Sequence, residues 1–352
     1  MKILLTGSKV DYELTMSYQR AFKENNWEVI IFPEAELYNE KLRFTKNRYL
    51  RGIFHRLFWK LFCKSINKKF IETVKEEKPA LVLVLKGWFF NPKTFFNLGK
   101  KMPQTILFNF NPDNPFNTWH HGNSNSWIRK SIPLYDVYFI WGKFLLKPLK
   151  KAGAKRTEYL PFGYDSELHY PVEVTDAEKK IFGSDIAFIG SWDEEREWWL
   201  NKLLMTDDLM TDDLKIWGNA WQKANKKLRE KWQGRAVIGE EFSKVCNASK
   251  IILNFVRKQN GSAHNMRTFE VPACQGFILS TRTEEAVGFF EEGKEADYFS
   301  TLEELKQKID FYLRNEESRK KIAEAGYKKL VGADYSYKDR AKRVLEIYKL
   351  LG

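Results

Sequence analysis

The feature that most constrains the fold is an alternation of short apolar runs with helical patterns. Each run is rich in β-branched or aromatic residues, and the stretch after it carries apolar residues at helical spacing. This alternation is typical of a parallel sheet whose strands are connected by helices. It predicts an α/β protein, with strands in the first half at residues 2–6, 28–32, 80–85, 105–110 and 137–141.

The alternation restarts after a link at residues 160–171 that contains two prolines and a glycine. Because a single core seldom grows beyond roughly 250 to 300 residues, a chain of 352 residues also favours two domains. We place the domains at residues 1–165 and 185–335, with a linker at 166–184 between them. Three helical stretches are expected beyond Leu302, and the last is amphipathic. The strands expected in the second domain are residues 185–189, 214–217, 236–238, 251–255 and 277–280.

Hydropathy, cysteine usage and charge indicate the cellular location of the protein and the charge of its partners. The longest purely apolar run, residues 80–85, is far shorter than the roughly 20 residues that span a bilayer, and the N-terminus lacks the length of a signal peptide. Cys63, Cys246 and Cys274 are widely separated and have no CxxC spacing, which is typical of reduced core thiols. We therefore expect a cytoplasmic protein. Its net charge of +13 implies an anionic partner: nucleic acid, an anionic membrane face or a phosphorylated substrate.

Two loops of the second domain have the composition of a phosphate site. Ligands of α/β sheets bind beyond the carboxyl ends of the strands, so we expect the site in the cleft between the domains. Gly190 and Ser191 follow one expected strand and enter a helix, where backbone N–H groups can face a phosphate. Arg257 lies in a basic loop after another strand, and its guanidinium suits a diphosphate.

His264, Arg267 and Glu270 follow at three-residue steps. The spacing alone fits two interpretations, a ligand-binding row at the mouth of a helix or the wet side of a surface helix. Because proline disrupts a helix interior, Pro272 favours a helix that begins nearer Phe269. Either geometry presents a carboxylate for sugar hydroxyls and a guanidinium for phosphate.

Several segments between residues 159 and 295 resemble one protein family. Residues 267–280, RTFEVPACQGFILS, resemble a segment of group 1 glycosyltransferases, closest to the branch named after the spore maturation protein CgeB. Five more pieces agree in the same order: 159–165 (YLPFGYD) with His169 and Pro171, 187–191 (AFIGS) with Arg196, 215–218 (KIWG), 249–254 (SKIILN) and 290–295 (FEEGKE). The resemblance implies the GT-B fold, in which two Rossmann-like domains face each other across a cleft. It also implies that the final helix, residues 336–352, packs back on the N-terminal domain.

The resemblance also implies roles for individual residues. Glu270 resembles the carboxylate that binds the donor ribose, Arg267 and Arg257 resemble diphosphate partners, and Gly190 and Ser191 resemble the phosphate-facing turn. Many relatives carry a second Glu eight residues before the ribose carboxylate, where this chain has Ser262, so sugar recognition and stereochemistry stay open. The full predicted donor-binding set is Gly190, Ser191, Arg196, Asn254, Arg257, His264, Arg267 and Glu270.

The N-terminal domain is expected to bind the acceptor. Asp113 lies in an Asn- and Pro-rich loop after a strand, where it either serves as a general base or caps a helix. His120 and His121 follow as weaker catalytic candidates, because exposed loop histidines are common.

Residues 41–69, from Lys41 to Lys69, contain ten Lys or Arg and no Asp or Glu. An apolar row with helical spacing runs through them: Leu50, Ile53, Phe54, Leu57, Phe58, Leu61, Phe62 and Ile66. We expect this row to pack on the N-terminal sheet with the cations in solvent. The alternative is that the segment rests on an anionic membrane surface.

These patterns predict a metal-independent glycosyltransferase, cytoplasmic or peripheral at the membrane. It would move a sugar from a nucleotide-diphosphate donor to a hydroxyl acceptor on a cell-surface glycan, a lipid-linked molecule or a protein. No D-x-D triplet is present, and no cofactor is expected besides the nucleotide-sugar co-substrate. Alternatives are a nucleotide-sugar epimerase or hydrolase of the same fold, a basic nucleic-acid-binding protein, and a non-catalytic assembly protein. Without a recognised nucleic-acid motif, no nucleic-acid partner is expected.

Overall fold

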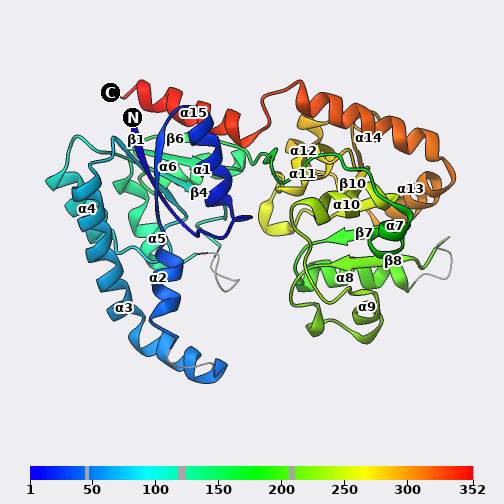
Figure 1. The fold of residues 1–352 in the computed structure, drawn as a ribbon, viewed down its shortest axis with the longest axis horizontal. Coiled ribbons are helices and arrows are strands. Elements are labelled where there is room, and N and C mark those ends of the chain that lie inside the picture. Colours follow the sequence, from blue (N-terminus) through cyan, green and yellow to red (C-terminus); the bar gives the residue numbers. More distant parts are fainter. Residues whose placement is uncertain (44–46, 118–123, 206–210, 352) are drawn as a thin grey trace. The chain divides into compact units, whose positions relative to one another are not determined.

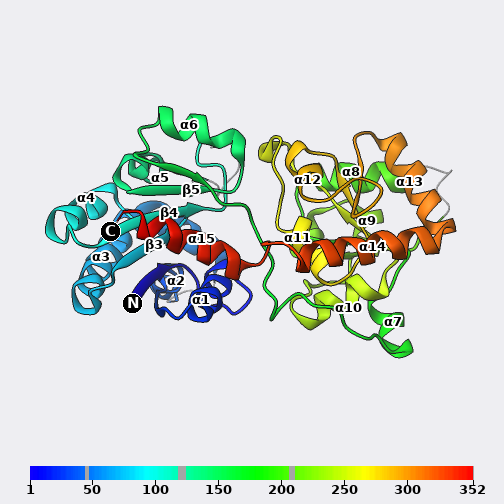
Figure 2. The ribbon, with the colours of Figure 1, turned by 90° about the horizontal axis from the view of Figure 1, so that it is seen from above.

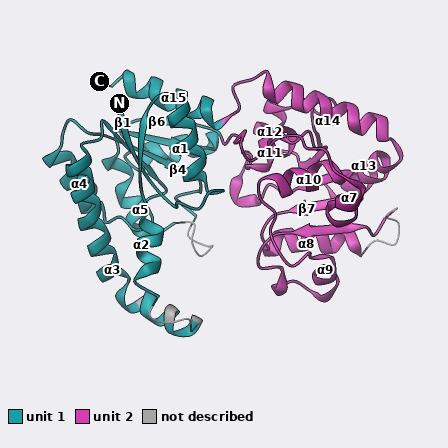
Figure 3. Cartoon of the chain, in the orientation of Figure 1, with its two compact units in different colours: residues 1–161, 337–352 teal, residues 162–336 magenta. Residues whose placement is uncertain are grey.

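The computed structural model describes residues 1–43, 47–117, 124–205 and 211–351. The chain forms two compact units (Figure 3). Unit 1 consists of Met1–Pro161 and Tyr337–Gly352, and unit 2 of Phe162–Ser336. Each unit is a parallel α/β sheet with helices on it, as the alternation of apolar runs predicts. Residues 166–184 belong to unit 2 and include a helix.

Unit 1 contains a six-stranded sheet in the order β2-β1-β3-β4-β5-β6, and each paired strand runs parallel to its neighbour. The central strand β3 is buried along its whole length, which explains its unbroken aliphatic sequence LVLVL. The strands are β1 (Lys2–Thr6), β2 (Glu28–Phe32), β3 (Leu81–Leu85), β4 (Ile106–Asn111), β5 (Val137–Ile140) and β6 (Thr157–Tyr159).

The helices of unit 1 connect these strands (Figure 1). The side chain of Asn47 accepts hydrogen bonds from two backbone N–H groups at the start of α3, and Asn91 caps α4 with Pro92 in its first turn. The helices are α1 (Leu14–Glu24), α2 (Glu34–Glu40), α3 (Arg48–Glu77), α4 (Pro92–Lys101), α5 (Ser126–Ser131), α6 (Leu146–Lys151) and, from the end of the chain, α15 (Tyr337–Lys349).

Helix α15 belongs to unit 1 although it follows unit 2 in the chain, and it lies against α1 (Figure 2). The ring of Tyr337 lies 5.3 Å from that of Tyr18, and the ring of Tyr348 lies 5.3 Å from that of Trp27. Asn25 donates to the backbone carbonyl of Lys338 at 3.2 Å. The amphipathic pattern of the last helix therefore reflects a buried face in the N-terminal unit.

The apolar row of α3 does not pack as expected. Only Phe54, Phe62 and Ile66 of the row are partly or fully buried, whereas Leu50, Ile53, Leu57, Phe58 and Leu61 are exposed. The reason is that α3 packs through the side of Trp59 and Phe62, whose rings lie 4.3 Å from Trp127 and 6.1 Å from Tyr38, and this side includes only part of the row. The expectation that the whole row covers the sheet is wrong.

Unit 2 contains a five-stranded parallel sheet in the order β11-β10-β9-β7-β8. Its core includes Phe188, Trp221 and Phe255, all almost fully buried. Its strands are β7 (Ile186–Ile189), β8 (Leu214–Trp217), β9 (Ile251–Asn254), β10 (Ile278–Thr281) and β11 (Asp297–Phe299). Its helices are α7 (Asp176–Phe182), α8 (Glu194–Leu204), α9 (Lys226–Lys231), α10 (Glu240–Ala248), α11 (Arg267–Ala273), α12 (Glu284–Phe289), α13 (Leu302–Arg314) and α14 (Glu316–Val331).

The strand expected at residues 236–238 is absent from the sheet. Gly234 and Gly239 bracket this segment with φ angles of 78° and 56°, so the chain turns on both sides of it. The sheet gains β11 instead, a three-residue edge strand that the sequence analysis did not identify, and unit 1 gains β6 in the same way. The three helical stretches expected beyond Leu302 are confirmed as α13, α14 and α15.

The three cysteines are buried. Among the residues that the structure describes, no helix is long and apolar enough to cross a membrane.

Candidate functional site in unit 2

The predicted phosphate loops meet at the carboxyl edge of the unit 2 sheet. Strands β7 and β9 are neighbours in the sheet, so the chain that follows each of them leaves from the same edge. The turn after β7 contains Gly190 and the exposed Ser191, and the loop after β9 contains Arg257 and leads to α11, which begins at Arg267. Parallel topology therefore brings together segments that lie about 70 residues apart in the chain.

Asp193 joins the two loops electrostatically. Its carboxylate caps α8 by accepting a hydrogen bond from the backbone N–H of Arg196 at 2.9 Å. The same carboxylate lies 3.4 Å from the guanidinium of Arg196 and 3.6 Å from that of Arg257. Arg196 also donates to the backbone carbonyl of Ser191 at 2.8 Å, which fixes the turn after β7.

Arg267 connects α11 to the end of β7. Its Nε donates to the backbone carbonyl of Ile189 at 3.0 Å, and its guanidinium forms an ion pair with Glu270 one helical turn away. The guanidinium also lies over the ring of Phe242 at 4.8 Å from the ring centre. Glu270 itself is buried. The arginine predicted to bind phosphate and the carboxylate predicted to bind ribose are therefore directly paired.

The three guanidinium groups of Arg196, Arg257 and Arg267 create an excess of positive charge. Burial lowers the pKa of Arg196 to about 10, and the nearby charges of Arg257 and Arg267 lower it further against the opposing effect of Asp193. Arg196 remains cationic at neutral pH. Asp193, Glu195 and Glu270 oppose these cations, and the grouping of three guanidinium groups suits an anion with several oxygens.

His169 is a fourth group at this position that the sequence analysis did not assign. Its Nε2 lies 3.7 Å from a carboxylate oxygen of Glu270, and its Nδ1 accepts a hydrogen bond from the backbone N–H of Asp165 at 3.3 Å. Burial lowers the pKa of His169, although the charge of Glu270 raises it, so the ring is neutral at neutral pH. The accepted hydrogen bond assigns the remaining proton to Nε2, which faces Glu270. His169 follows residues 159–165, one of the segments that resemble group 1 glycosyltransferases. This position in the sequence is the only feature that could have identified it.

Two predicted donor-binding residues have their side chains inside the unit. His264 is fully buried: its Nε2 accepts from the backbone N–H of Phe162 at 3.1 Å, and its Nδ1 contacts Glu285 at 3.0 Å. Asn254 is also buried, donates to Ser280 at 2.9 Å and accepts from Asn265 at 2.8 Å. Both side chains hold the loop between β9 and α11 in place.

Helix α11 begins at Arg267, two residues before the expected start at Phe269. Pro272 lies inside it, and the helix ends one residue later. Proline lacks the N–H group that would bond to the carbonyl of Thr268, but a seven-residue helix loses only that one bond. Arg267 and Glu270 consequently share a helical face, while His264 precedes the helix.

Of the three catalytic candidates in unit 1, the structure describes Asp113. Asp113 follows β4, and its carboxylate accepts a hydrogen bond from Lys86 Nζ at 2.7 Å. Lys86 directly follows β3 and has a left-handed backbone, with φ of 63°. One carboxylate oxygen of Asp113 is thus occupied by an ammonium group, and its role as a base stays a prediction. His120 and His121 lie outside the described residues.

A second carboxyl group lies at the same edge of the unit 1 sheet. Glu34, at the start of α2, is buried, and burial raises its pKa to about 8 against hydrogen bonds from the backbone of Glu34 and Gly7 and from the Thr6 side chain. Glu34 therefore carries a proton at neutral pH. The sequence analysis did not identify it; an acid two residues after a strand was the only signal.

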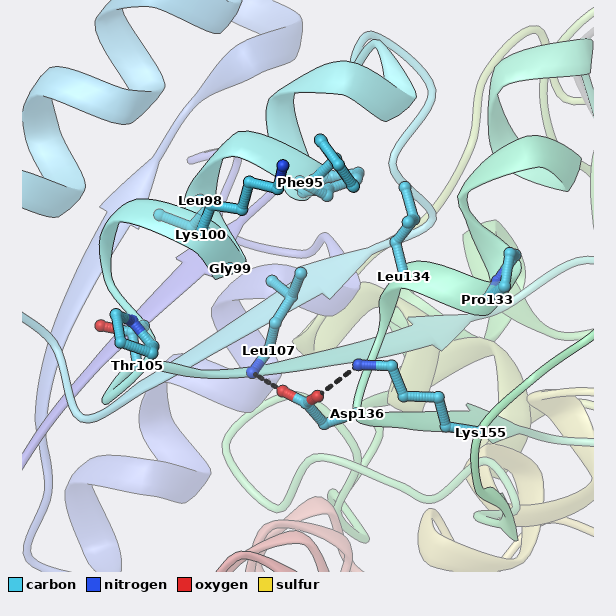
Figure 4. Close-up of a pocket in the computed structure, with 12 residues that line it drawn as sticks. Phe95, Leu98, Gly99, Lys100, Thr105, Leu107, Pro133, Leu134, Asp136 and Lys155 are labelled. Carbon is cyan, nitrogen blue, oxygen red and sulfur yellow. Dashed lines mark hydrogen bonds and ion pairs between the residues drawn. The ribbon is translucent and has the colours of Figure 1, made fainter.

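A surface pocket of unit 1 lies at the opposite edge of that sheet (Figure 4). It has a volume of about 380 Å³ and is lined near the amino ends of β4 and β5 by Leu107, Asp136 and Lys155. Asp136 accepts from the backbone N–H of Leu107 at 2.9 Å and from Lys155 at 2.8 Å, so its polar groups satisfy each other. The pocket is therefore distinct from the predicted site. Across residues 1–43, 47–117, 124–205 and 211–351, no group of three or more metal-binding side chains occurs.

Comparison with known proteins gives one family match within the chain. Residues 196–346 match the glycosyl transferase-like family. The match covers Arg196, Arg257, Arg267 and Glu270. No curated protein sequence matches the chain.

Solved structures match over both units. Sucrose-phosphate synthase (tll1590) from Thermosynechococcus elongatus has a TM-score of 0.66 and 10% identity, covering 100% of this chain and 99% of that one. Alr3699/HepE from Anabaena, solved in complex with UDP-glucose, has a TM-score of 0.65 and 11% identity, covering 99% of each chain. A glycosyltransferase from Rickettsia africae has a TM-score of 0.65 and 14% identity, covering 99% of this chain and 97% of that one. These matches confirm the predicted GT-B fold.

Gly218, at the end of β8, allows the turn after β7 to take its shape. It has a φ of +154°, and a Cβ atom there would lie 2.0 Å from the carbonyl oxygen of Gly190. We predict that Gly218→Ala destabilises the protein by roughly 2 kcal/mol or more, because neither the backbone angle nor the contact tolerates a methyl group. Thermal or urea unfolding measures the loss. Gly288→Ala is the control, because its Cβ would meet nothing within 4 Å; equal effects of the two changes would contradict the assignment.

Glu34 predicts a pH dependence of stability. In the unfolded chain its carboxyl titrates near 4.5, whereas in the folded protein its pKa is about 8. Between these values only the folded state keeps the proton, so the free energy of unfolding falls as pH rises from about 4.5 to 8, by at most about 5 kcal/mol. Glu34→Gln removes this loss. The free energy of unfolding of the variant, relative to that of the natural protein, should therefore increase as pH rises from about 4.5 to 8. Urea unfolding between pH 5 and 9 tests this, and parallel curves for the two proteins would refute it.

Proposed function

We propose that this protein is a glycosyltransferase that moves a sugar from a nucleotide-diphosphate donor to a hydroxyl acceptor. The observation that carries the proposal is the cluster of Arg196, Arg257 and Arg267 beside the buried Glu270, at the carboxyl edge of the unit 2 sheet. The match of residues 196–346 to the glycosyl transferase-like family and the UDP-glucose complex of a protein with the same fold support it.

The charges of the site suit a nucleoside diphosphate. A diphosphate offers several oxygens, and the Arg257 guanidinium, which is partly exposed and lies 3.6 Å from Asp193, can contribute hydrogen bonds to one of them. Arg267 is less adjustable because it also holds the carbonyl of Ile189. Glu270 has a second carboxylate oxygen that faces His169, and we propose that this oxygen accepts hydrogen bonds from the ribose hydroxyls.

In the proposed reaction the bond between the anomeric carbon and the diphosphate oxygen breaks, and a bond to the acceptor oxygen forms. The departing diphosphate gains negative charge, which Arg196, Arg257 and Arg267 would stabilise. The acceptor hydroxyl loses its proton to a base, for which Asp113 is our candidate if the reaction inverts. Independence of metal, the identity of the acceptor and membership of the CgeB-like branch are part of the proposal.

Nucleotide binding gives the first test. A ligand at about 100 times its dissociation constant adds roughly 2.7 kcal/mol of stability, so UDP, GDP or TDP should raise the melting temperature. We predict that Arg257→Ala weakens binding of the preferred diphosphate at least tenfold, since a hydrogen bond to a charged group contributes roughly 1.5 to 3 kcal/mol. The same change should have little effect on binding of the corresponding nucleoside, which lacks the phosphates.

The matched control for this test is Arg229→Ala, which removes an exposed arginine of α9 in the same unit. Arg257 is preferred over Arg267 because removing Arg267 would leave Glu270 buried without its cation and destabilise the unit. Absence of a shift with every nucleoside diphosphate, or an equal loss in both variants, would overturn the donor site.

Product analysis gives the second test. We predict that Glu270→Gln reduces transfer by at least tenfold through weaker donor binding, and that Asp113→Asn reduces it without changing the dissociation constant of the nucleotide. Full transfer in both variants would contradict the assigned roles. An altered free nucleotide-sugar without acceptor would assign the protein as an epimerase, and release of free sugar alone would assign it as a hydrolase.

A further inference from the structure

The exposed face of α3 is a feature of unit 1 that the proposed function does not use. Ile53, Leu57 and Leu61 follow one another at four-residue steps and are 52%, 69% and 60% exposed. Leu50 lies on the same side of the helix, Phe58 lies at its edge with its ring 6.1 Å from that of Phe62, and both are also exposed. These five residues are called the α3 stripe below. Soluble proteins rarely leave so many large apolar side chains together in water without a partner.

The α3 stripe lies opposite the face that α3 buries. That packed face includes Trp59, whose ring lies 4.3 Å from that of Trp127, and Phe62, whose ring lies 6.1 Å from that of Tyr38. Helical geometry places Trp59 about half a turn from Leu50 and Leu61. The first half of α3 extends beyond the sheet of unit 1 (Figure 1). Among the residues that the structure describes, the helix thus has two apolar sides: Trp59 and Phe62 contact other elements of unit 1, whereas the α3 stripe is exposed.

The charges around the α3 stripe identify the kind of partner. Lys64 and Lys68 follow Leu61 after three and seven residues, which keeps them on the same side of the helix, Lys60 flanks the stripe, and all three lysines are exposed. Residues 41–69 contain ten cations and no acid. A second copy of this chain would bring the same cations against them and be repelled. A surface that is apolar inside and anionic at its edge is complementary to both features.

We propose that the α3 stripe binds the surface of an anionic lipid membrane. The helix lies in the plane of the interface, with Ile53, Leu57 and Leu61 among the acyl chains and Lys60, Lys64 and Lys68 at the phosphate groups. Tyr49, at the start of the helix and 83% exposed, lies at the level of the headgroups. This binding holds unit 1 at the membrane without a spanning segment, and it is independent of nucleotide chemistry in unit 2.

Co-sedimentation with vesicles tests the proposal on the full chain. Vesicles of phosphatidylcholine with phosphatidylglycerol should bind the protein, and vesicles of phosphatidylcholine alone should bind it at least tenfold more weakly. Added salt should weaken the binding, because the lysines are exposed to screening. Equal binding to both vesicles, or none to either, would overturn the proposal, as would dimer formation through the stripe with no vesicle binding.

Two sets of variants separate the stripe from general charge and hydrophobicity. Ile53→Ser, Leu57→Ser and Leu61→Ser together should reduce vesicle binding at least tenfold, whereas Ile181→Ser, Phe311→Ser and Val331→Ser, which are similarly exposed in unit 2, should not. Lys60→Glu, Lys64→Glu and Lys68→Glu together should have the same effect, whereas Lys147→Glu, Lys321→Glu and Lys342→Glu, with the same change in net charge, should not.

Nucleotide-induced thermal shifts of every variant serve as the folding control, because all the changes lie outside the donor site. Similar losses in test and control sets would overturn the role of α3. A failed donor site would abolish the thermal shifts and leave vesicle binding intact, so the two proposals are tested separately.

Discussion

The ion pair between Arg267 and Glu270 is the interaction on which the site in unit 2 depends. Glu270 is buried, and an isolated carboxylate there would be strongly destabilising, so the guanidinium must stay beside it. The same guanidinium donates to the carbonyl of Ile189, the last residue of β7. One arginine therefore pairs with a buried carboxylate and binds the carbonyl of the last residue of β7. This fixes the distance between α11 and the loop that is proposed to face the diphosphate.

The pairing of Arg267 with Glu270 also affects the roles of Arg196 and Arg257. Glu270 pairs with Arg267, and the other two cations, Arg196 and Arg257, both lie beside the carboxylate of Asp193. Arg196 is held in place by the carbonyl of Ser191, whereas the Arg257 guanidinium is partly exposed. The site thus combines fixed cations with one that can adjust, and a fixed positive field with little reorganisation is what stabilises charge as it develops on a leaving group.

Strands and the loops that follow them could be predicted from the sequence, because both depend on the periodicity of apolar residues. Apolar runs located nine of the ten expected strands, because a buried parallel strand must be apolar along its length. The loops after β7 and β9 were identified because strand ends are read directly from those runs. Burial of individual polar side chains was not predicted: the spacing of His264, Arg267 and Glu270 is uniform, yet His264 is enclosed between Phe162 and Glu285 while Arg267 is partly exposed. Long-range neighbours decide this, and a local pattern does not contain them.

The two faces of α3 show why a helical pattern cannot decide which side is covered. The sequence contains apolar residues all around the first half of this helix, so the row from Leu50 to Ile66 fitted burial on the sheet as well as exposure. The structure buries the side of Trp59, where the neighbouring elements supply Trp127 and Tyr38 as aromatic partners. Once that side is taken, Leu57 and Leu61 point away from the unit with lysines next to them. Internal packing does not account for leucines on the uncovered side, whereas the proposed contact with a membrane surface would place them in an apolar environment.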